Sequence, residues 1–145
     1  MPSERMAPIF IIADDDRSAI ERLIRVLHFE WFYIPIWEAC LVVRYAAHFA
    51  TTAVFLADEI DYPEGGSARL LQQLLDQVGK PVVILTEAWN PEQTERWKRM
   101  GAADCIPHPT RFDHRAEGMR AKMQEFALQS VAVRIEGREL QGPGR

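Results

Sequence analysis

The sequence predicts a doubly wound α/β domain, in which five parallel strands form a sheet in the order 2-1-3-4-5 with helices on both faces. Five short apolar runs alternate with segments of helical periodicity, which is typical of a parallel sheet built from strand–helix units. The second run contains Pro35, which cannot donate to a ladder and so indicates an edge strand. Acidic residues follow the first and third runs, as expected beside a topological switch point.

The length and composition indicate one folded domain. The chain has 145 residues, of which 48% are hydrophobic and 26% charged, and its net charge of −4 gives no electrostatic case for nucleic acid as a direct partner. No apolar run reaches the ~18 residues of a membrane span. We expect a cytoplasmic protein whose two cysteines, Cys40 and Cys105, are buried thiols. We predict a domain over 1–130, followed at 131–145 by a tail or the start of a linker.

The first strand–helix unit has a strand at 9–13 that ends in three consecutive acids. In the following helix, Ser18 and Glu21 form a capping-box pattern, and Asp16 is an alternative N-cap. The apolar residues of this helix share one face: Ile20, Leu23, Ile24 and Leu27.

The middle of the chain predicts two further strands. The edge strand covers 32–37, and a nearly all-apolar helix over 38–50 follows it. The third strand, 53–58, is a continuous apolar run that ends at a single carboxylate, as in a strand buried on both faces. Ser67 is the expected cap of the next helix and Gly79 its end. The apolar face of that helix comprises Leu70, Leu71, Leu74, Leu75 and Val78.

The last third of the chain predicts strands at 81–86 and 103–106. Between them, Asn90 and Pro91 open a helix, with asparagine as the cap and proline at the first helical position. This helix has few apolar positions beyond Trp97, so it is expected to pack loosely and to be largely exposed. The final helix carries an apolar stripe that is expected to pack into the core: Phe112, Ala116, Met119, Met123 and Phe126.

Polar residues follow four of the predicted strands at one edge of this flavodoxin-like sheet: Asp14 and Asp15, Asp58, Thr86, and His108. Closely spaced carboxylates repel one another unless a cation neutralises them. Mg²⁺ is suited to such a site, because it takes one or two carboxylates, keeps several waters and accepts phosphate oxygens. A carboxylate beside Mg²⁺ can attack a phosphoryl group. Asp58 is therefore predicted to accept phosphate.

These motifs give the chain a resemblance to the receiver domain of two-component response regulators, from about residue 8 to residue 129. No single motif is specific, but their order and spacing are those of the family. They are Ile12-Ala13-Asp14-Asp15-Asp16, Val54-Phe55-Leu56-Ala57-Asp58 with Gly66 eight residues on, Val83-Ile84-Leu85-Thr86, Gly101-Ala102-Ala103-Asp104, and Pro109.

The resemblance implies a role for each site residue. Asp15 would bind Mg²⁺ directly, and Asp14 directly or through water. The backbone carbonyl of Ile60 would complete the protein ligands, together with Asp58. Asp58 would receive its phosphoryl group from a histidine kinase or phosphotransfer protein, and Thr86 would turn inward to bond it. The protein would thus be a signalling phosphoacceptor rather than an enzyme.

Several positions depart from the family pattern. His108 stands where the family has a lysine, Glu87 follows the threonine in place of a small residue, and Cys105 replaces the switch aromatic. The proline after the acceptor is displaced by one position to Pro63. For His108 three arrangements are open, namely contact with phosphate, pairing with Glu87 to close an idle pocket, or solvation.

Three functions are compatible with these features. In the first, phosphorylation of Asp58 alters a face made by the fourth helix, fifth strand and fifth helix, which could also form a homodimer. In the second, favoured by His108 and Glu87, the chain is a pseudo-receiver that binds partners or dimerises without phosphorylation. The third, a Mg²⁺-dependent phosphohydrolase of the haloacid dehalogenase type, ranks low because no second acidic pair follows the fourth strand.

Overall fold

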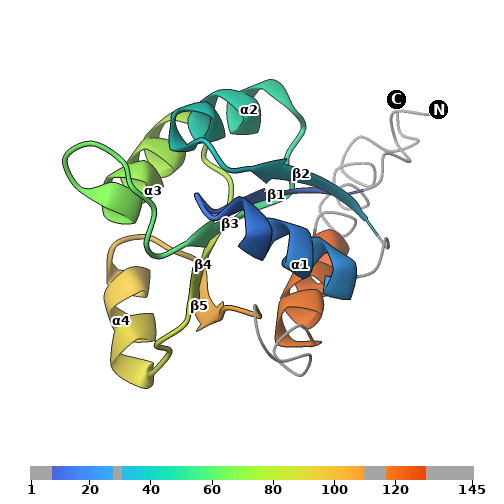
Figure 1. Ribbon diagram of the computed structural model, residues 1–145. Helices are drawn as coiled ribbons and strands as arrows, with labels where there is room; N and C mark the ends of the chain where they lie inside the picture. Colours follow the sequence, from blue (N-terminus) through green and yellow to red (C-terminus); the bar gives the residue numbers. More distant parts are fainter. Residues whose placement is uncertain (1–7, 28–30, 110–116, 130–145) are drawn as a thin grey trace, which may run out of the picture.

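A computed structural model describes residues 8–27, 31–109 and 117–129. All five strands are parallel and lie in the order β2-β1-β3-β4-β5, as the sequence predicts (Figure 1). The strands are β1 (Ile9–Ala13), β2 (Phe32–Ile36), β3 (Ala53–Ala57), β4 (Val82–Thr86) and β5 (Asp104–Pro107). The helices are α1 (Arg17–Leu27), the short 3₁₀ helix η2 (Ala39–Leu41), α2 (Val42–His48), α3 (Gly66–Gln77) and α4 (Pro91–Arg99). A C-terminal helix covers 117–129.

The proline in β2 faces the open edge of the sheet. Phe32 N donates to Pro8 O at 3.3 Å, and Ile36 O accepts from Asp14 N at 3.1 Å, so these two residues turn their backbone groups toward β1. Because successive residues of a strand alternate in direction, Pro35 turns its nitrogen away from β1. The missing N–H therefore costs no ladder hydrogen bond, and it leaves the outer edge a poor template for a further strand.

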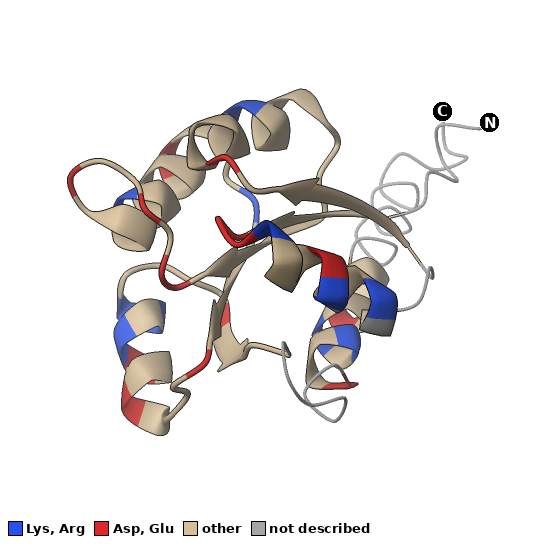
Figure 2. Ribbon diagram, viewed as in Figure 1, with Lys and Arg blue, Asp and Glu red and all other residues tan. Residues whose placement is uncertain are grey.

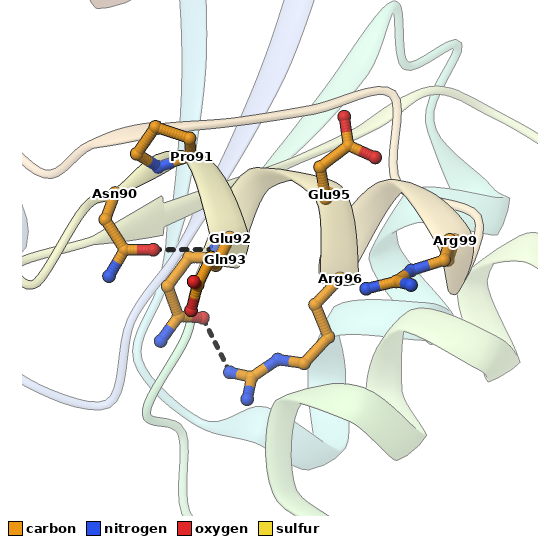
Figure 3. A pocket seen from close by; sticks show the side chains of 7 residues that line it. All are labelled: Asn90, Pro91, Glu92, Gln93, Glu95, Arg96 and Arg99. Atoms are coloured by element: carbon orange, nitrogen blue, oxygen red, sulfur yellow. Dashed lines mark hydrogen bonds between the residues drawn. The ribbon is translucent and has the colours of Figure 1, made fainter.

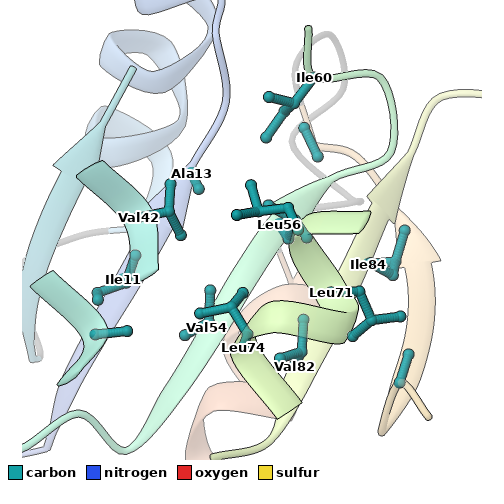
Figure 4. Packing of buried hydrophobic residues seen from close by; sticks show 14 of the residues in the cluster. Ile11, Ala13, Val42, Val54, Leu56, Ile60, Leu71, Leu74, Val82 and Ile84 are labelled. Atoms are coloured by element: carbon teal, nitrogen blue, oxygen red, sulfur yellow. The ribbon is translucent and has the colours of Figure 1, made fainter. Parts of the chain in front are cut away.

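Two hydrophobic layers enclose the sheet. On one face α2, α3 and α4 pack against alternate strand residues, including Ile11, Val54, Leu56 and Ile84 (Figure 4). On the other face α1 and the C-terminal helix cover the remaining positions, which include Phe10, Phe55 and Val83. Met119, Met123 and Phe126 lie in this second layer, which confirms the core role of the stripe for the described residues. Phe112 and Ala116 lie outside the described residues.

The helix α4 is largely exposed, as predicted, but one buried side chain anchors it where loose packing was expected. Trp97 is only 6% exposed and belongs to the same apolar layer as Ala102 and Cys105. A single indole covers enough area to anchor a helix whose other residues are mostly polar. The expectation of loose packing was wrong because it counted apolar positions and not the area that each one buries.

Helix ends are held by the predicted caps in most cases. Asp16, and not Ser18, caps α1, since its Oδ1 accepts from Ala19 N at 3.2 Å. Asn90 caps α4 by accepting from Gln93 N at 2.9 Å. Gly79 follows α3 with φ +70°, as expected of a C-terminal stop. Ser67 lies inside α3, whose N-cap is Gly65, and it has a different role described below.

Cys40 and the C-terminal segment were the subject of two further predictions. Cys40 is exposed rather than buried, because it lies in η2, a turn with no buried residue. The boundary near residue 130 and the tail at 131–145 fall outside the described residues, so they stay predictions. Within the described ranges, no helix has the length and apolar character needed to cross a membrane.

Candidate functional site

An acidic cavity of about 370 Å³ lies where β1, β3 and β4 end. Figure 2 shows acidic segments at these strand ends and basic segments on the neighbouring α1. Six of the residues that line the cavity are acids. Arg22 and His108 are the lining residues whose side chains can carry a positive charge. The lining residues are Asp14, Asp15, Asp16, Ala19, Arg22, Ala57, Asp58, Glu59, Glu87, Ala88 and His108.

Asp14 is the most buried of these acids. Its Oδ1 accepts from Asp16 N at 3.0 Å, and its Oδ2 lies 3.0 Å from His108 Nε2. The two side chains of this pair are 10% and 5% exposed. His108 is therefore not solvated, and sequence reasoning missed its contact with Asp14, because nothing in a sequence links residues that are 94 positions apart.

Asp15 and Asp58 are each held by one hydrogen bond that involves the backbone of a neighbouring segment. Asp15 is exposed, and its Oδ2 accepts from Asp61 N at 2.9 Å, so the segment after β1 is tied to the segment after β3. Asp58 is half-buried, and its N donates to Leu85 O at 2.9 Å, which continues the β3–β4 pairing by one residue. The sheet itself thus positions the carboxylate of Asp58.

The loop that carries Ile60 is anchored by Ser67. The hydroxyl of Ser67 donates to Ala57 O at 2.6 Å and accepts from Ile60 N at 3.0 Å. Gly66, with φ +57°, lies against the Ile60 carbonyl oxygen, which a Cβ at position 66 would approach to 3.2 Å. The predicted helix cap is therefore a clamp that holds the segment between β3 and α3.

The residues present suit a Mg²⁺ ion by their chemistry. Carboxylates and a carbonyl oxygen are hard ligands, and Gly66 leaves beside the Ile60 carbonyl a space that a Cβ would fill. Among the described residues, no three His, Cys, Asp or Glu side chains are gathered closely enough to form a metal site by themselves. Mg²⁺ does not require such a cluster, because it commonly keeps several of its waters.

Thr86 and Glu87 lie at the end of β4 in different environments. Thr86 is fully buried, and its Oγ1 accepts from Ala88 N at 3.2 Å, so it caps the turn after the strand and does not line the cavity. Glu87 is exposed and does line the cavity. Glu87 is therefore an additional acidic side chain on the lining of the cavity.

Cys105 is a buried residue of β5, the strand that precedes His108. Burial, together with the charges of Asp58 and Asp104, raises the pKa of its thiol to about 11. The backbone carbonyl of Cys105 accepts from Trp89 Nε1 at 2.9 Å. Trp89, which is 45% exposed, thus covers β5 from the segment that leads into α4.

The two thiols are expected to differ in reactivity in the folded protein. At neutral pH iodoacetamide should alkylate exposed Cys40 and leave Cys105 unmodified, because alkylation requires the thiolate and Cys105 is buried and protonated. Peptide mass spectrometry before and after addition of a denaturant measures this. Equal labelling of both thiols without denaturant would contradict the burial of Cys105.

A further ion pair joins the C-terminal helix to β5. Lys122 Nζ lies 2.8 Å from Asp104 Oδ2 and 3.0 Å from Glu125 Oε2. Burial alone would raise the pKa of the Asp104 carboxyl, but the hydrogen bonds from Lys122 and from Cys105 N, with the charge of Lys122, leave it below its usual value. The pair fixes the helix against the strand next to the site.

A second hollow, of about 540 Å³, lies along α4 (Figure 3). Gln93 accepts from Arg96 at 2.6 Å there, and two acids and two arginines are among the lining residues. No strand end contributes to it, and it contains none of the predicted site residues. The acidic cavity is therefore the candidate functional site.

Comparison with solved structures finds the same fold in receiver domains. The receiver domain of the Francisella response regulator 1452 has a TM-score of 0.70 at 14% identity, over 85% of this chain and 98% of that one. A CheY-like receiver domain protein from Methanospirillum hungatei JF-1 has a TM-score of 0.65 at 17% identity, over 85% and 98%. The response regulator domain of Thermotoga maritima CheB has a TM-score of 0.70 at 14% identity, over 83% and 96%.

Sequence comparison adds nothing to this likeness. No family model and no curated protein matches the sequence. At identities of 14–17% the similarity to these structures establishes the fold and not the activity.

Proposed function

We propose that this chain is a receiver-type phosphoacceptor of two-component signal transduction, with Asp58 as the acceptor. The observation that supports it most is the position of Asp58, which stands at the end of the central strand β3 and shares one cavity with Asp14 and Asp15. This arrangement occurs on a fold shared with receiver domains. A phosphoacceptor needs a carboxylate nucleophile and groups that neutralise phosphate charge, and the cavity contains both kinds.

The proposed reaction is a direct displacement at phosphorus. An oxygen of the Asp58 carboxylate forms a bond to phosphorus while the bond to the leaving group breaks, and the leaving group departs with the electron pair. Asp14, Asp15, Asp58 and the carbonyl of Ile60 would hold Mg²⁺, which supplies positive charge to screen the carboxylates from the phosphoryl oxygens. The natural donor is a histidine kinase or a phosphotransfer protein, which implies a cytoplasmic location.

The proposed readout begins at Thr86. Its hydroxyl, which now accepts from Ala88 N, turns to donate to a phosphoryl oxygen on Asp58. That exchange would move the segment after β4, which carries Glu87 and Trp89 and leads into α4. The face formed by α4, β5 and the C-terminal helix would gain or lose a partner, which could be a second copy of the chain.

Intact-mass spectrometry tests the proposal. Incubation of the protein with acetyl phosphate and Mg²⁺ should add one phosphoryl group per chain, and a chelator of divalent cations should prevent it. Beryllofluoride with Mg²⁺ should shift the amide signals of Asp58 and Thr86 in the NMR spectrum. A folded protein that shows neither the mass gain nor the shifts would contradict the proposal.

A pseudo-receiver is the second candidate, and the pair of His108 with Asp14 supports it. A buried imidazole 3.0 Å from Asp14 occupies an oxygen that would otherwise be available to a metal, and Glu87 adds a further acidic side chain to the lining of the cavity. In this case the protein would bind its partner or dimerise without phosphorylation. Equal partner affinity of the wild type and Asp58→Ala, with no mass gain, would establish it.

A further inference from the structure

Acidic side chains dominate the lining of the cavity, so a phosphoryl group bound there would be stabilised by neighbouring cations. Six carboxylate side chains line it, and a bound phosphoryl group adds between about one and a half and two negative charges at neutral pH. His108 directs its Nε2 at Asp14, 3.0 Å away. The remaining lining residue with a positive charge is Arg22, whose guanidinium is charged at every accessible pH.

Arg22 lies on the face of α1 that meets the cavity. It follows Ala19 by three positions, so both residues are on one side of the helix, and both line the cavity. Side chains of a helix lean toward its N-terminus. The N-terminus of α1 is the end that bears the acids, and Arg22 lines the same cavity as Asp14 and Asp15.

Arg22 is available for a ligand, in contrast to Arg17 on the same helix. Arg17 Nε bonds Glu21 Oε1 at 3.2 Å, and its guanidinium lies 4.6 Å from the ring centre of Trp37. Arg22 is exposed and forms no ion pair with any residue in the part of the chain that the structure describes. Because Arg22 has no ion partner among the described residues, binding of an anion to its guanidinium would break none of the ion pairs described for α1.

We propose that Arg22 is a phosphoryl-binding residue, whose guanidinium contacts the phosphoryl group on Asp58. The inference rests on the proposed function, since it names the cation of the same site. As the Asp58–phosphorus bond forms and the phosphorus–oxygen bond of acetyl phosphate breaks, acetate leaves with the electron pair, and Arg22 gives up no proton. Its planar fork donates two hydrogen bonds to phosphoryl oxygens, which a lysine ammonium does not reproduce.

Arg22→Gln is expected to slow phosphorylation by acetyl phosphate and Mg²⁺ by about tenfold, because one charge-assisted contact to the phosphoryl group is lost. Arg22→Lys should fall between this variant and the wild type. The matched control is Arg25→Gln, which removes an exposed arginine of the same helix that does not line the cavity and should leave the rate unchanged. Initial rates from intact-mass spectrometry measure the effect, and the apparent affinity for beryllofluoride should follow the same order.

The outcomes separate this inference from the proposed function. If the wild type gains a phosphoryl group, and Arg22→Gln and Arg25→Gln are phosphorylated at the same rate, the role of Arg22 is wrong. The proposed function would then still stand. A wild type that gains none and ignores beryllofluoride refutes the function itself. The guanidinium Nε–H signal of Arg22 in the wild type gives a measurement that needs no variant. It should shift when beryllofluoride and Mg²⁺ are added, and an unchanged signal would exclude the contact.

Discussion

Asp58→Asn is expected to abolish phosphorylation by acetyl phosphate, with no detectable mass gain under conditions that fully modify the wild type. The amide keeps the shape of the side chain at the end of β3 but lacks a nucleophilic carboxylate, so no bond to phosphorus can form. Asp58 is half-buried with no other described residue paired to its side chain, so the fold should be retained. Circular dichroism and the unfolding midpoint check that it is.

The control for this prediction is Asp76→Asn, the same chemical change at an exposed position of α3. It should be modified as fast as the wild type. Fragmentation of the modified wild-type peptide should locate the phosphoryl group on Asp58. A full mass gain in Asp58→Asn would show that another acid, such as Asp14 or Asp15, is the acceptor, and the proposed reaction would then be wrong.

His108→Ala is expected to lower the free energy of unfolding by about 2–3 kcal/mol, because it leaves the buried carboxylate of Asp14 without the imidazole that contacts it. The side chains of this pair are 5% and 10% exposed, so water replaces the lost contact poorly. The control is His48→Ala, since His48 is exposed and a surface substitution typically changes stability by less than about 0.5 kcal/mol. Urea titration followed by circular dichroism measures both variants.

Added Mg²⁺ should restore part of the stability that His108→Ala loses. If Asp14 is a ligand, the cation neutralises the carboxylate that the imidazole no longer contacts, and binding to the folded state raises its stability. The gain should exceed that of the wild type at the same Mg²⁺ concentration. Equal stability of His108→Ala and His48→Ala would show that the contact with Asp14 adds nothing, and a missing Mg²⁺ effect would argue against Asp14 as a ligand.

The sheet and the gathering of the acids could be predicted from local patterns alone. Apolar runs with period-3.6 segments between them require parallel strands, and Pro35 placed the second strand at the edge, where the structure has it. Once the strand order is known, Asp14, Asp15 and Asp58 must lie near one another. They follow β1 and β3, which are adjacent parallel strands, at the carboxyl end of the sheet. The caps Asp16 and Asn90 were also predictable, because a cap acts on its own first turn.

Interactions between distant elements could not be predicted in this way. The helix that carries Trp97 was expected to pack loosely because it is mostly polar, yet the indole packs into an apolar layer against the sheet. Ser67 was expected to cap a helix, but its hydroxyl reaches Ala57 and Ile60 because the chain turns back on itself there. A signal for Arg22 did exist in its spacing from Ala19, but only the cavity shows which face of α1 meets the acids.

The amino-acid sequence by itself therefore determined the order of the strands and the meeting of three carboxylates at the end of β1 and β3, since both follow from periodicity and from the geometry of parallel strands. Tertiary structure alone decided which basic side chains lie at the cavity and which acid His108 contacts. His108 lies beside Asp14 because it follows β5, a strand of the sheet, and Arg22 lines the same cavity because α1 packs on one face of that sheet. Distances of a few ångströms between such elements depend on how whole layers pack, and no pattern of neighbouring residues encodes them.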